Sequence, residues 1–165
     1  MKKIALVLAL FLTGCASAGY TPLYQKVQVG KISVNRVYLT NPAQNVGTRR
    51  PAQIVQQELA RHYPEGDGGE YMFDVALTED YDTLAVRRDA TDQRKQLRLN
   101  GTVTFYDEKR RPVHTSVITK YSPYNVDDKP FSTETSLNSA REVTARAFAD
   151  EVVRRVALFL GDGRK

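Results

Sequence analysis

From Thr133 to Leu160 the chain contains no proline and no glycine. Gly161 follows this stretch, and glycine commonly stands just past the end of a helix. We therefore predict a helix of roughly 26 residues, which would span about 39 Å and could cross a whole small sheet. Its apolar stripe recurs at helical spacing and consists of Leu137, Ala140, Thr144, Ala147, Phe148, Val152, Val156 and Phe159.

Three strand-like stretches precede this helix, and in each of them the side chains alternate between two faces. Period two with one polar face is what a sheet covered on a single side requires. We place His114 on the polar face of the third stretch. The stretches are 71–78, 96–105 and 113–121.

The connections around these strands follow from their composition. Residues 107–112 are charged and end in proline, which predicts a polar turn between the last two strands. Residues 83–91 are expected to extend the first two strands as a long exposed hairpin. Residues 123–130 begin and end with proline, and we expect them to form a loop before the long helix.

Two elements come earlier in the chain. Residues 31–39 are predicted as a strand, with a bulge near Asn35 where the apolar alternation shifts by one residue. Thr48 can cap a helix whose first turn holds Pro51. We expect this amphipathic helix to have about four turns and to end before Pro64.

The resulting element order is β-α-β-β-β-α. It predicts an α+β two-layer sandwich, in which a four-stranded mixed sheet carries two amphipathic helices on one face. We assign residues 31–161 to a single α+β domain and residues 162–165 to a C-terminal tail. No internal repeat or low-complexity segment indicates a second domain, and a chain of this length can bury a substantial core.

The N-terminus carries the features of a bacterial lipoprotein signal. Two lysines follow the initiator methionine, and nine apolar residues occupy positions 4–12. That run is too short to span a bilayer, which needs about 20 residues. Its last residue, Leu12, begins the sequence Leu-Thr-Gly-Cys. This sequence is a lipobox, in which the chain is cut before the cysteine and the thiol is acylated. We predict a signal peptide over residues 1–14, lipidation of Cys15 and a lipidated tether over residues 15–30.

Acyl chains on Cys15 would hold the domain at a membrane surface, since each buried methylene contributes roughly 0.8 kcal/mol. Ala16 follows the cysteine, whereas aspartate at that position is the usual inner-membrane retention signal in enteric bacteria. We therefore expect a lipid-anchored outer-membrane protein that faces the periplasm. Cys15 is the only cysteine, which suits that oxidising compartment. The export signal also excludes nucleic acid as a partner.

The chain lacks the residue patterns of the common enzyme classes. His62 and His114 are the only histidines, and neither has another strong ligand at metal-binding spacing. No phosphate loop and no GxSxG nucleophile elbow is present. Asp127 and Asp128 are adjacent, and such pairs in loops typically form solvated turns. We expect a protein that is not an enzyme and needs no cofactor or metal.

Basic residues gather around the predicted hairpin. The chain holds 24 Lys and Arg against 19 Asp and Glu, and loss of Lys2 and Lys3 with the signal peptide would leave 22 against 19. Clustered arginine favours phosphate or carboxylate groups. Charges on an exposed hairpin also protect it from aggregation, so both interpretations stay open. The cluster consists of Arg87, Arg88, Arg94, Lys95 and Arg98.

Short motifs follow the lipobox along nearly the whole mature chain: Gly19-Tyr20-Thr21-Pro22-Leu23-Tyr24, Ile54-Val55-Gln56-Gln57-Glu58-Leu59, Tyr71-Met72-Phe73-Asp74-Val75, Tyr121-Ser122-Pro123-Tyr124-Asn125, Arg141-Glu142 and Ala149-Asp150-Glu151-Val152-Val153-Arg154-Arg155-Val156. In their order and spacing they resemble the lipopolysaccharide-assembly lipoprotein family (LptE-type), particularly its alphaproteobacterial branch. One departure lies in the tether. Three residues separate Cys15 from Gly19, where the family often has glycine directly after cysteine.

The resemblance implies a non-enzymatic component of the outer-membrane lipopolysaccharide translocon. Members of that family sit inside its large β-barrel as a plug, help the barrel assemble and bind lipopolysaccharide. The basic cluster would then have a phosphate-bearing ligand, and Lys129, in the loop before the long helix, is a second candidate. An alternative is a periplasmic regulatory or auxiliary lipoprotein, such as a peptidoglycan-synthase activator or a lipid-transport accessory. An envelope hydrolase would need a nucleophile, base or metal set that the residues do not provide.

Overall fold

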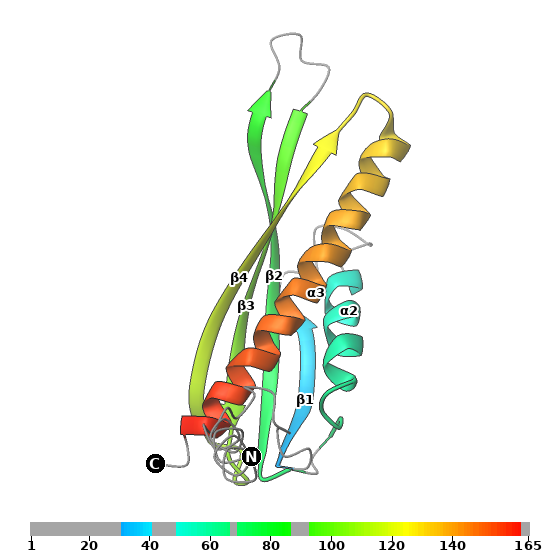
Figure 1. The fold of residues 1–165 in the computed structure, drawn as a ribbon. Coiled ribbons are helices and arrows are strands. Elements are labelled where there is room, and N and C mark those ends of the chain that lie inside the picture. Colours follow the sequence, from blue (N-terminus) through cyan, green and yellow to red (C-terminus); the bar gives the residue numbers. More distant parts are fainter. Residues whose placement is uncertain (1–30, 41–48, 67–68, 87–92, 163–165) are drawn as a thin grey trace, which may run out of the picture.

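The computed structural model describes residues 31–40, 49–66, 69–86 and 93–162. Its elements follow the predicted order (Figure 1). They are β1 (Ile32–Leu39), α2 (Arg49–Ala60), β2 (Tyr71–Val86), β3 (Gln93–Tyr106), β4 (Pro112–Val126) and α3 (Pro130–Asp162).

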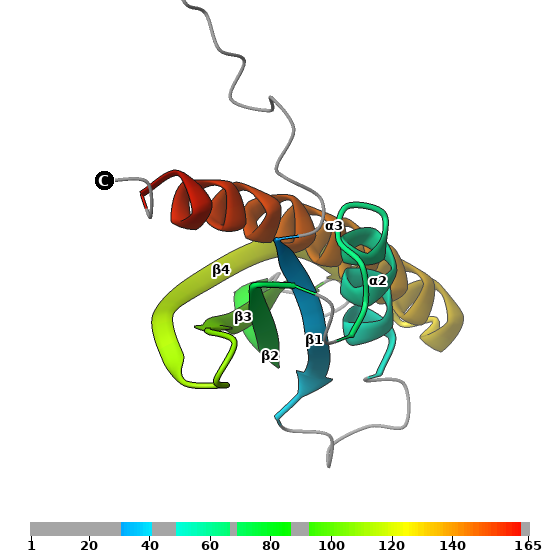
Figure 2. The ribbon, with the colours of Figure 1, turned by 90° about the horizontal axis from the view of Figure 1, so that it is seen from below.

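The four strands form one mixed sheet in the order β1-β2-β3-β4. β1 pairs with β2 in parallel, and the other two pairs are antiparallel. α2 lies in the connection between the parallel strands, which cannot be joined by a tight turn. Figure 2 shows both helices on the same side of the sheet. The predicted α+β sandwich with its four-stranded mixed sheet is therefore confirmed.

The core lies between the inner face of the sheet and the two helices. Phe73, Phe105 and Phe148 are fully buried there and belong to one cluster of apolar side chains. Gly101 on β3 gives the ring of Phe148 its place, because a Cβ atom at this position would lie 2.3 Å from the Cζ atom of Phe148. α2 contributes Val55 and Leu59 to the same cluster. The sheet thus buries one face, as the alternating pattern requires.

The bulge in β1 is confirmed, since the register with β2 shifts between Val34 and Arg36. α2 ends earlier than predicted, at Ala60. The backbone N–H groups of His62 and Tyr63 still donate to the carbonyl oxygen of Leu59, each at 2.9 Å, so a final turn follows the helix before Pro64. β2 continues to Val86 and β3 begins at Gln93, so the predicted extension of this strand pair is confirmed as far as residue 86.

The predicted loop over residues 123–130 is wrong in its first half. β4 runs to Val126, and Pro123 pairs with Gln96 of β3. Proline is tolerated here because β4 is the last strand of the sheet, so its backbone nitrogen can face away from β3. A proline alone therefore does not indicate a loop when the strand lies at an edge.

α3 is longer than predicted at both ends. It has 33 residues, begins with Pro130 and includes Gly161 and Asp162, so its length is about 50 Å. Proline is well suited to the first helical position because its nitrogen needs no partner there. Among the described residues, no helix is both long and apolar enough to cross a membrane.

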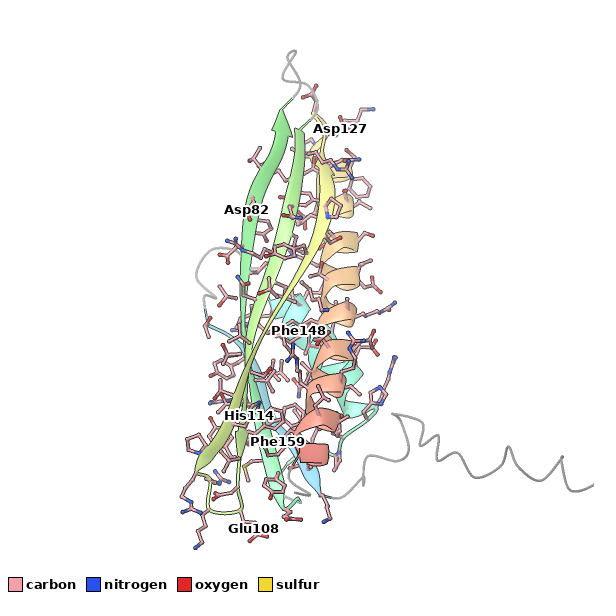
Figure 3. The ribbon with its side chains drawn as sticks, turned by 60° about the vertical axis from the view of Figure 1, so that its left-hand side comes forward. Asp82, Glu108, His114, Asp127, Phe148 and Phe159 are labelled. Atoms are coloured by element: carbon pink, nitrogen blue, oxygen red, sulfur yellow. The ribbon has the colours of Figure 1, made fainter. Side chains whose placement is uncertain are left out.

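The prediction for His114 is wrong. Its ring stacks against Phe159 of α3 with the ring centroids 5.8 Å apart, and it lies 5.6 Å from Phe105 (Figure 3). His114 therefore faces the helices. The uncovered face of β4 instead presents Val117, which is 68% exposed, and Tyr121, which is 55% exposed. β-branched and aromatic residues occur on both faces of this strand, so alternation alone could not tell which face is covered.

Candidate functional site

One end of the elongated molecule, called here the distal end, brings together the end of β2, the start of β3, the end of β4 and the start of α3 (Figure 1). The opposite, proximal end holds the start of β1, the turn between β3 and β4 and the end of α3. Figure 3 shows the two ends through Asp127 and Glu108. The chain therefore enters the domain at the end opposite to the predicted basic hairpin.

Three of the predicted site residues lie at the distal end. Arg94 and Lys95 are the second and third residues of β3, where they pair with Asn125 and Tyr124 of β4. Lys129 is exposed immediately before α3. The structure therefore gathers cations from two segments that are far apart in the sequence. Of the remaining predicted residues, Cys15, Arg87 and Arg88 lie outside the described part of the chain.

Arg98 has a different environment, because carboxylates of β2 surround it. Its guanidinium nitrogens lie 3.7 Å from Asp80 Oδ2 and 3.3 Å from Asp82 Oδ2. Asn100 also donates to Asp80 Oδ2, at 3.0 Å. An anionic ligand would have to compete with two carboxylates for this guanidinium, so Arg98 is a weaker candidate than Lys129.

A buried ion pair connects α3 to the sheet below the distal end. Arg141 Nε donates to Glu79 Oε1 at 2.8 Å, and the two side chains are 4% and 1% exposed. Arg141 also donates to the hydroxyl of Tyr81 at 2.8 Å, and that hydroxyl donates to Glu79. Tyr124 of β4 packs edge-on against Tyr81. Three elements thus meet in one polar cluster.

Electrostatics keep this cluster charged. Burial acts to lower the pKa of Arg141, but hydrogen bonding to Glu79 and the charge of that carboxylate outweigh it, so the pKa is raised. Burial, with the hydrogen bond to Glu79, raises the pKa of the Tyr81 hydroxyl well above its ordinary value. The tyrosine therefore stays protonated and the arginine stays charged, which is the state that preserves all of these hydrogen bonds.

The sequence pattern did not indicate this cluster. The predicted strand ended at residue 78, although the alternation of β2 continues through Glu79 and Tyr81 on the same face as Leu77. Arg141 follows Ala140 on the apolar side of α3, and its position there was a usable signal. A polar residue next to an apolar stripe is common on a helix border, so the pattern alone did not indicate burial.

The short turn that leads into α3 is held by side chains. The N–H of Asp127 donates to Thr133 Oγ1 at 2.9 Å, and Thr133 Oγ1 donates to the carbonyl of Asp127 at 3.0 Å. Ser132 Oγ donates to Asp127 Oδ2 at 2.9 Å. The turn-forming interpretation of Asp127 is confirmed. Just before this turn, the N–H of Asn125 in β4 donates to Ser136 Oγ at 3.1 Å. This hydrogen bond attaches the end of the strand to the helix.

A second inter-element ion pair lies nearer the middle of α3. Lys120 Nζ of β4 donates to Glu151 Oε2 at 3.1 Å, and Arg154 donates to the same oxygen at 2.6 Å. The hydrogen bond from Arg154 is the main reason that the pKa of Glu151 falls to about 2, against the opposing effect of burial and with support from Lys120.

The proximal end has a shallow cavity of about 280 Å³. Asp107 lines it and also organises the turn, since its carboxylate accepts hydrogen bonds from the backbone N–H groups of Lys109 and Arg111. The backbone hydrogen bond from Arg111 is the main cause that lowers the pKa of Asp107. None of the predicted site residues that the structure describes lines this cavity.

No protein-family model matches the chain, and no curated protein matches it in sequence. Solved structures do resemble the fold. A protein from Caulobacter crescentus CB15 that is assigned as a lipoprotein has a TM-score of 0.56 at 16% identity, over 81% of this chain and 92% of that one. A minor lipoprotein from Acinetobacter baumannii has a TM-score of 0.52 at 13% identity, over 78% and 93%.

Rare lipoprotein B from Shewanella oneidensis also matches, with a TM-score of 0.50 at 9% identity over 82% of this chain and 99% of that one. At such identities the likeness concerns the fold. The chain therefore shares its architecture with bacterial lipoproteins, over most of its own length and almost the whole length of theirs.

Proposed function

We propose that this chain is a lipid-anchored outer-membrane protein that faces the periplasm. It acts as plug and assembly partner of the large β-barrel of the lipopolysaccharide translocon, and it binds lipopolysaccharide during delivery to the cell surface. The mechanism is binding, without a bond made or broken. The observation that carries the proposal is that exposed cations from β3 and from the turn before α3 gather at the end of the domain opposite to the end where the tether enters.

The N-terminal sequence supports the anchor. The lipobox predicts acylation of Cys15, and the fold is shared with bacterial lipoproteins. The tether reaches the domain at Lys31, at the proximal end. Since α3 is about 50 Å long, the distal end stands a whole domain length from the point of attachment. An anchored protein of this shape can hold a ligand well away from the leaflet that carries its lipid.

The cations at the distal end support the proposal that lipopolysaccharide is the ligand. Lipopolysaccharide carries phosphates on its lipid part, and ammonium and guanidinium groups form charge-assisted hydrogen bonds with phosphate oxygens. Lys129 and Arg94 are both exposed, so a ligand can reach them without rearranging the core. Arg87 and Arg88 belong to the same hairpin by sequence and would add to the site.

The polar side chains on the uncovered face of the sheet support the proposed role as a plug. Thr102, Thr104 and Asn100 of β3 lie on this face and are half-buried. Their hydroxyl and amide groups can be solvated in a polar, water-filled barrel lumen. Asp80 and Asp82 of β2 both pair with Arg98 on the same face, so charges of both signs are interspersed there.

The first experiment identifies the partner. The acylated protein is purified from gently solubilised outer membranes, and what accompanies it is determined by mass spectrometry. The proposal predicts a one-to-one complex with a large β-barrel. Recovery with a cell-wall synthase or an inner-membrane transporter would replace it with the regulatory interpretation.

A second experiment tests the ligand site. We expect the double variant Arg94→Glu with Lys129→Glu to weaken lipopolysaccharide binding about tenfold or more, because it turns two attractive contacts into repulsive ones. The double variant Arg50→Glu with Lys109→Glu changes the net charge equally at positions away from the distal end, and it should bind normally. Equal losses in both variants would show that only the overall charge matters.

A further inference from the structure

Phe131, the second residue of α3, has an unusual exposure. It is 85% exposed, more than any other large apolar side chain of the described residues. Phenylalanine is among the residues most often buried, and this ring stands at the distal end, two positions after Lys129. Exposed apolar side chains in isolation are common, so its meaning depends on what holds it there and on what surrounds it.

Hydrogen bonds hold the backbone of this residue in place. The N–H of Ser132 donates to the carbonyl of Lys129 at 3.1 Å. Thr135 Oγ1 donates to the carbonyl of Phe131 at 2.9 Å. The inward side of this part of the helix is already filled by Leu137 and Ala140. Hydrogen bonds therefore hold the start of the helix in a conformation that presents the ring outward.

Two carboxylates near Phe131 already accept hydrogen bonds from neighbouring side chains. The carboxylate of Asp127 accepts a hydrogen bond from Ser132, and that of Glu134 accepts one from Asn138. Lys129, two positions before Phe131, is exposed, and Asp128 is exposed as well. Three acidic residues, Asp127, Asp128 and Glu134, are balanced only when Lys129 is counted together with Arg94 and Lys95 of β3, so charge by itself would hold a polar anion only weakly in salt. A ligand that also buries the ring would bind through both kinds of contact.

We propose that Phe131 contacts the acyl chains of bound lipopolysaccharide while Lys129 contacts its phosphates. The distal end then recognises an acylated anion and discriminates against a polar polyanion of the same charge. This inference rests on the proposed function, and it adds the class of ligand that the site selects. The two contributions add: removal of the phenyl ring from water favours any ligand with a hydrocarbon chain, and the ammonium group of Lys129 favours its phosphates.

The test compares two probes on the purified mature chain. One probe is lipopolysaccharide, and the other is the same lipopolysaccharide after alkaline removal of its acyl chains. We expect Phe131→Ser to weaken binding of the acylated probe about tenfold and to leave binding of the deacylated probe unchanged. Phe131→Leu, which keeps an apolar side chain, should restore most of the affinity. Lys129→Glu should weaken binding of both probes.

Val143→Ser is the matched control, because Val143 is an apolar residue of the same helix that is 58% exposed and lies three turns farther along. Equal effects of Phe131→Ser and Val143→Ser, or no effect of Phe131→Ser on the acylated probe, would overturn the inference while the proposed function stands. If the unmodified chain binds neither probe, the ligand of the proposed function and this inference both fail. Circular dichroism of each variant shows whether the fold is retained.

Discussion

The ion pair between Arg141 and Glu79 makes a sharp prediction about stability. Replacing Arg141 with methionine keeps an unbranched apolar side chain but removes the guanidinium, the partner of a carboxylate that is only 1% exposed. Breaking a buried pair from one side typically costs about 3–5 kcal/mol, because the remaining charge is left uncompensated. We expect Arg141→Met to lower the free energy of unfolding by roughly that amount.

The expected change in melting temperature follows from the size of the domain. For 150 residues or so, each kcal/mol shifts the melting temperature by about 2–4 °C, so the variant should melt about 6–20 °C lower. Urea denaturation followed by far-ultraviolet circular dichroism gives the free energy directly. The chain has no tryptophan and nine tyrosines, so tyrosine fluorescence provides a second probe.

The double variant Arg141→Met with Glu79→Met separates the cost of an unpaired buried charge from the contribution of the ion pair itself. It removes both charges together, so no buried charge is left without a partner, and it should recover much of the loss. Asn138, which accepts a hydrogen bond from Arg141, is nearer the surface and is replaced by alanine as a control of small expected effect. A cost below about 1 kcal/mol for Arg141→Met, or strictly additive costs in the double variant, would refute the reasoning.

Three further predictions test other parts of the molecule. Gly101→Ala should destabilise by about 1–3 kcal/mol, because its Cβ would lie 2.3 Å from the ring of Phe148, whereas Gly161→Ala, with open space around it, should be neutral or stabilising in thermal melts. The folded-state pKa of Glu151, about 2, lies below its unfolded value of 4.5, so its contribution to stability is present above pH 4.5 and is lost as the pH falls toward 2. Glu151→Gln should therefore flatten the acid limb of a melting-temperature profile, and an unchanged limb would contradict this assignment. Arg98→Gln should change stability by less than about 1 kcal/mol, since the pair with Asp82 is partly exposed, and should affect lipopolysaccharide binding less than Lys129→Glu does.

The sequence by itself determined the elements and the layer architecture. Alternation with period two and helical spacing both report which side chains leave water, and that requirement acts locally. For this reason the mixed four-stranded sheet, the two helices and the bulge near Asn35 could be predicted. The lipobox and the order of short motifs likewise belong to the sequence alone, because targeting signals are recognised as linear segments.

Tertiary structure decided the limits of the elements and the partners of the charges. Pro123 lies in a strand only because β4 is the last strand of the sheet, and His114 faces the helices because α3 brings Phe159 against it. Glu79 and Arg141 are separated by 62 positions, so no local pattern could show that they meet. Pairing between distant charges depends on how the layers pack, and the packing brings the cations of β3 and Lys129 to one end.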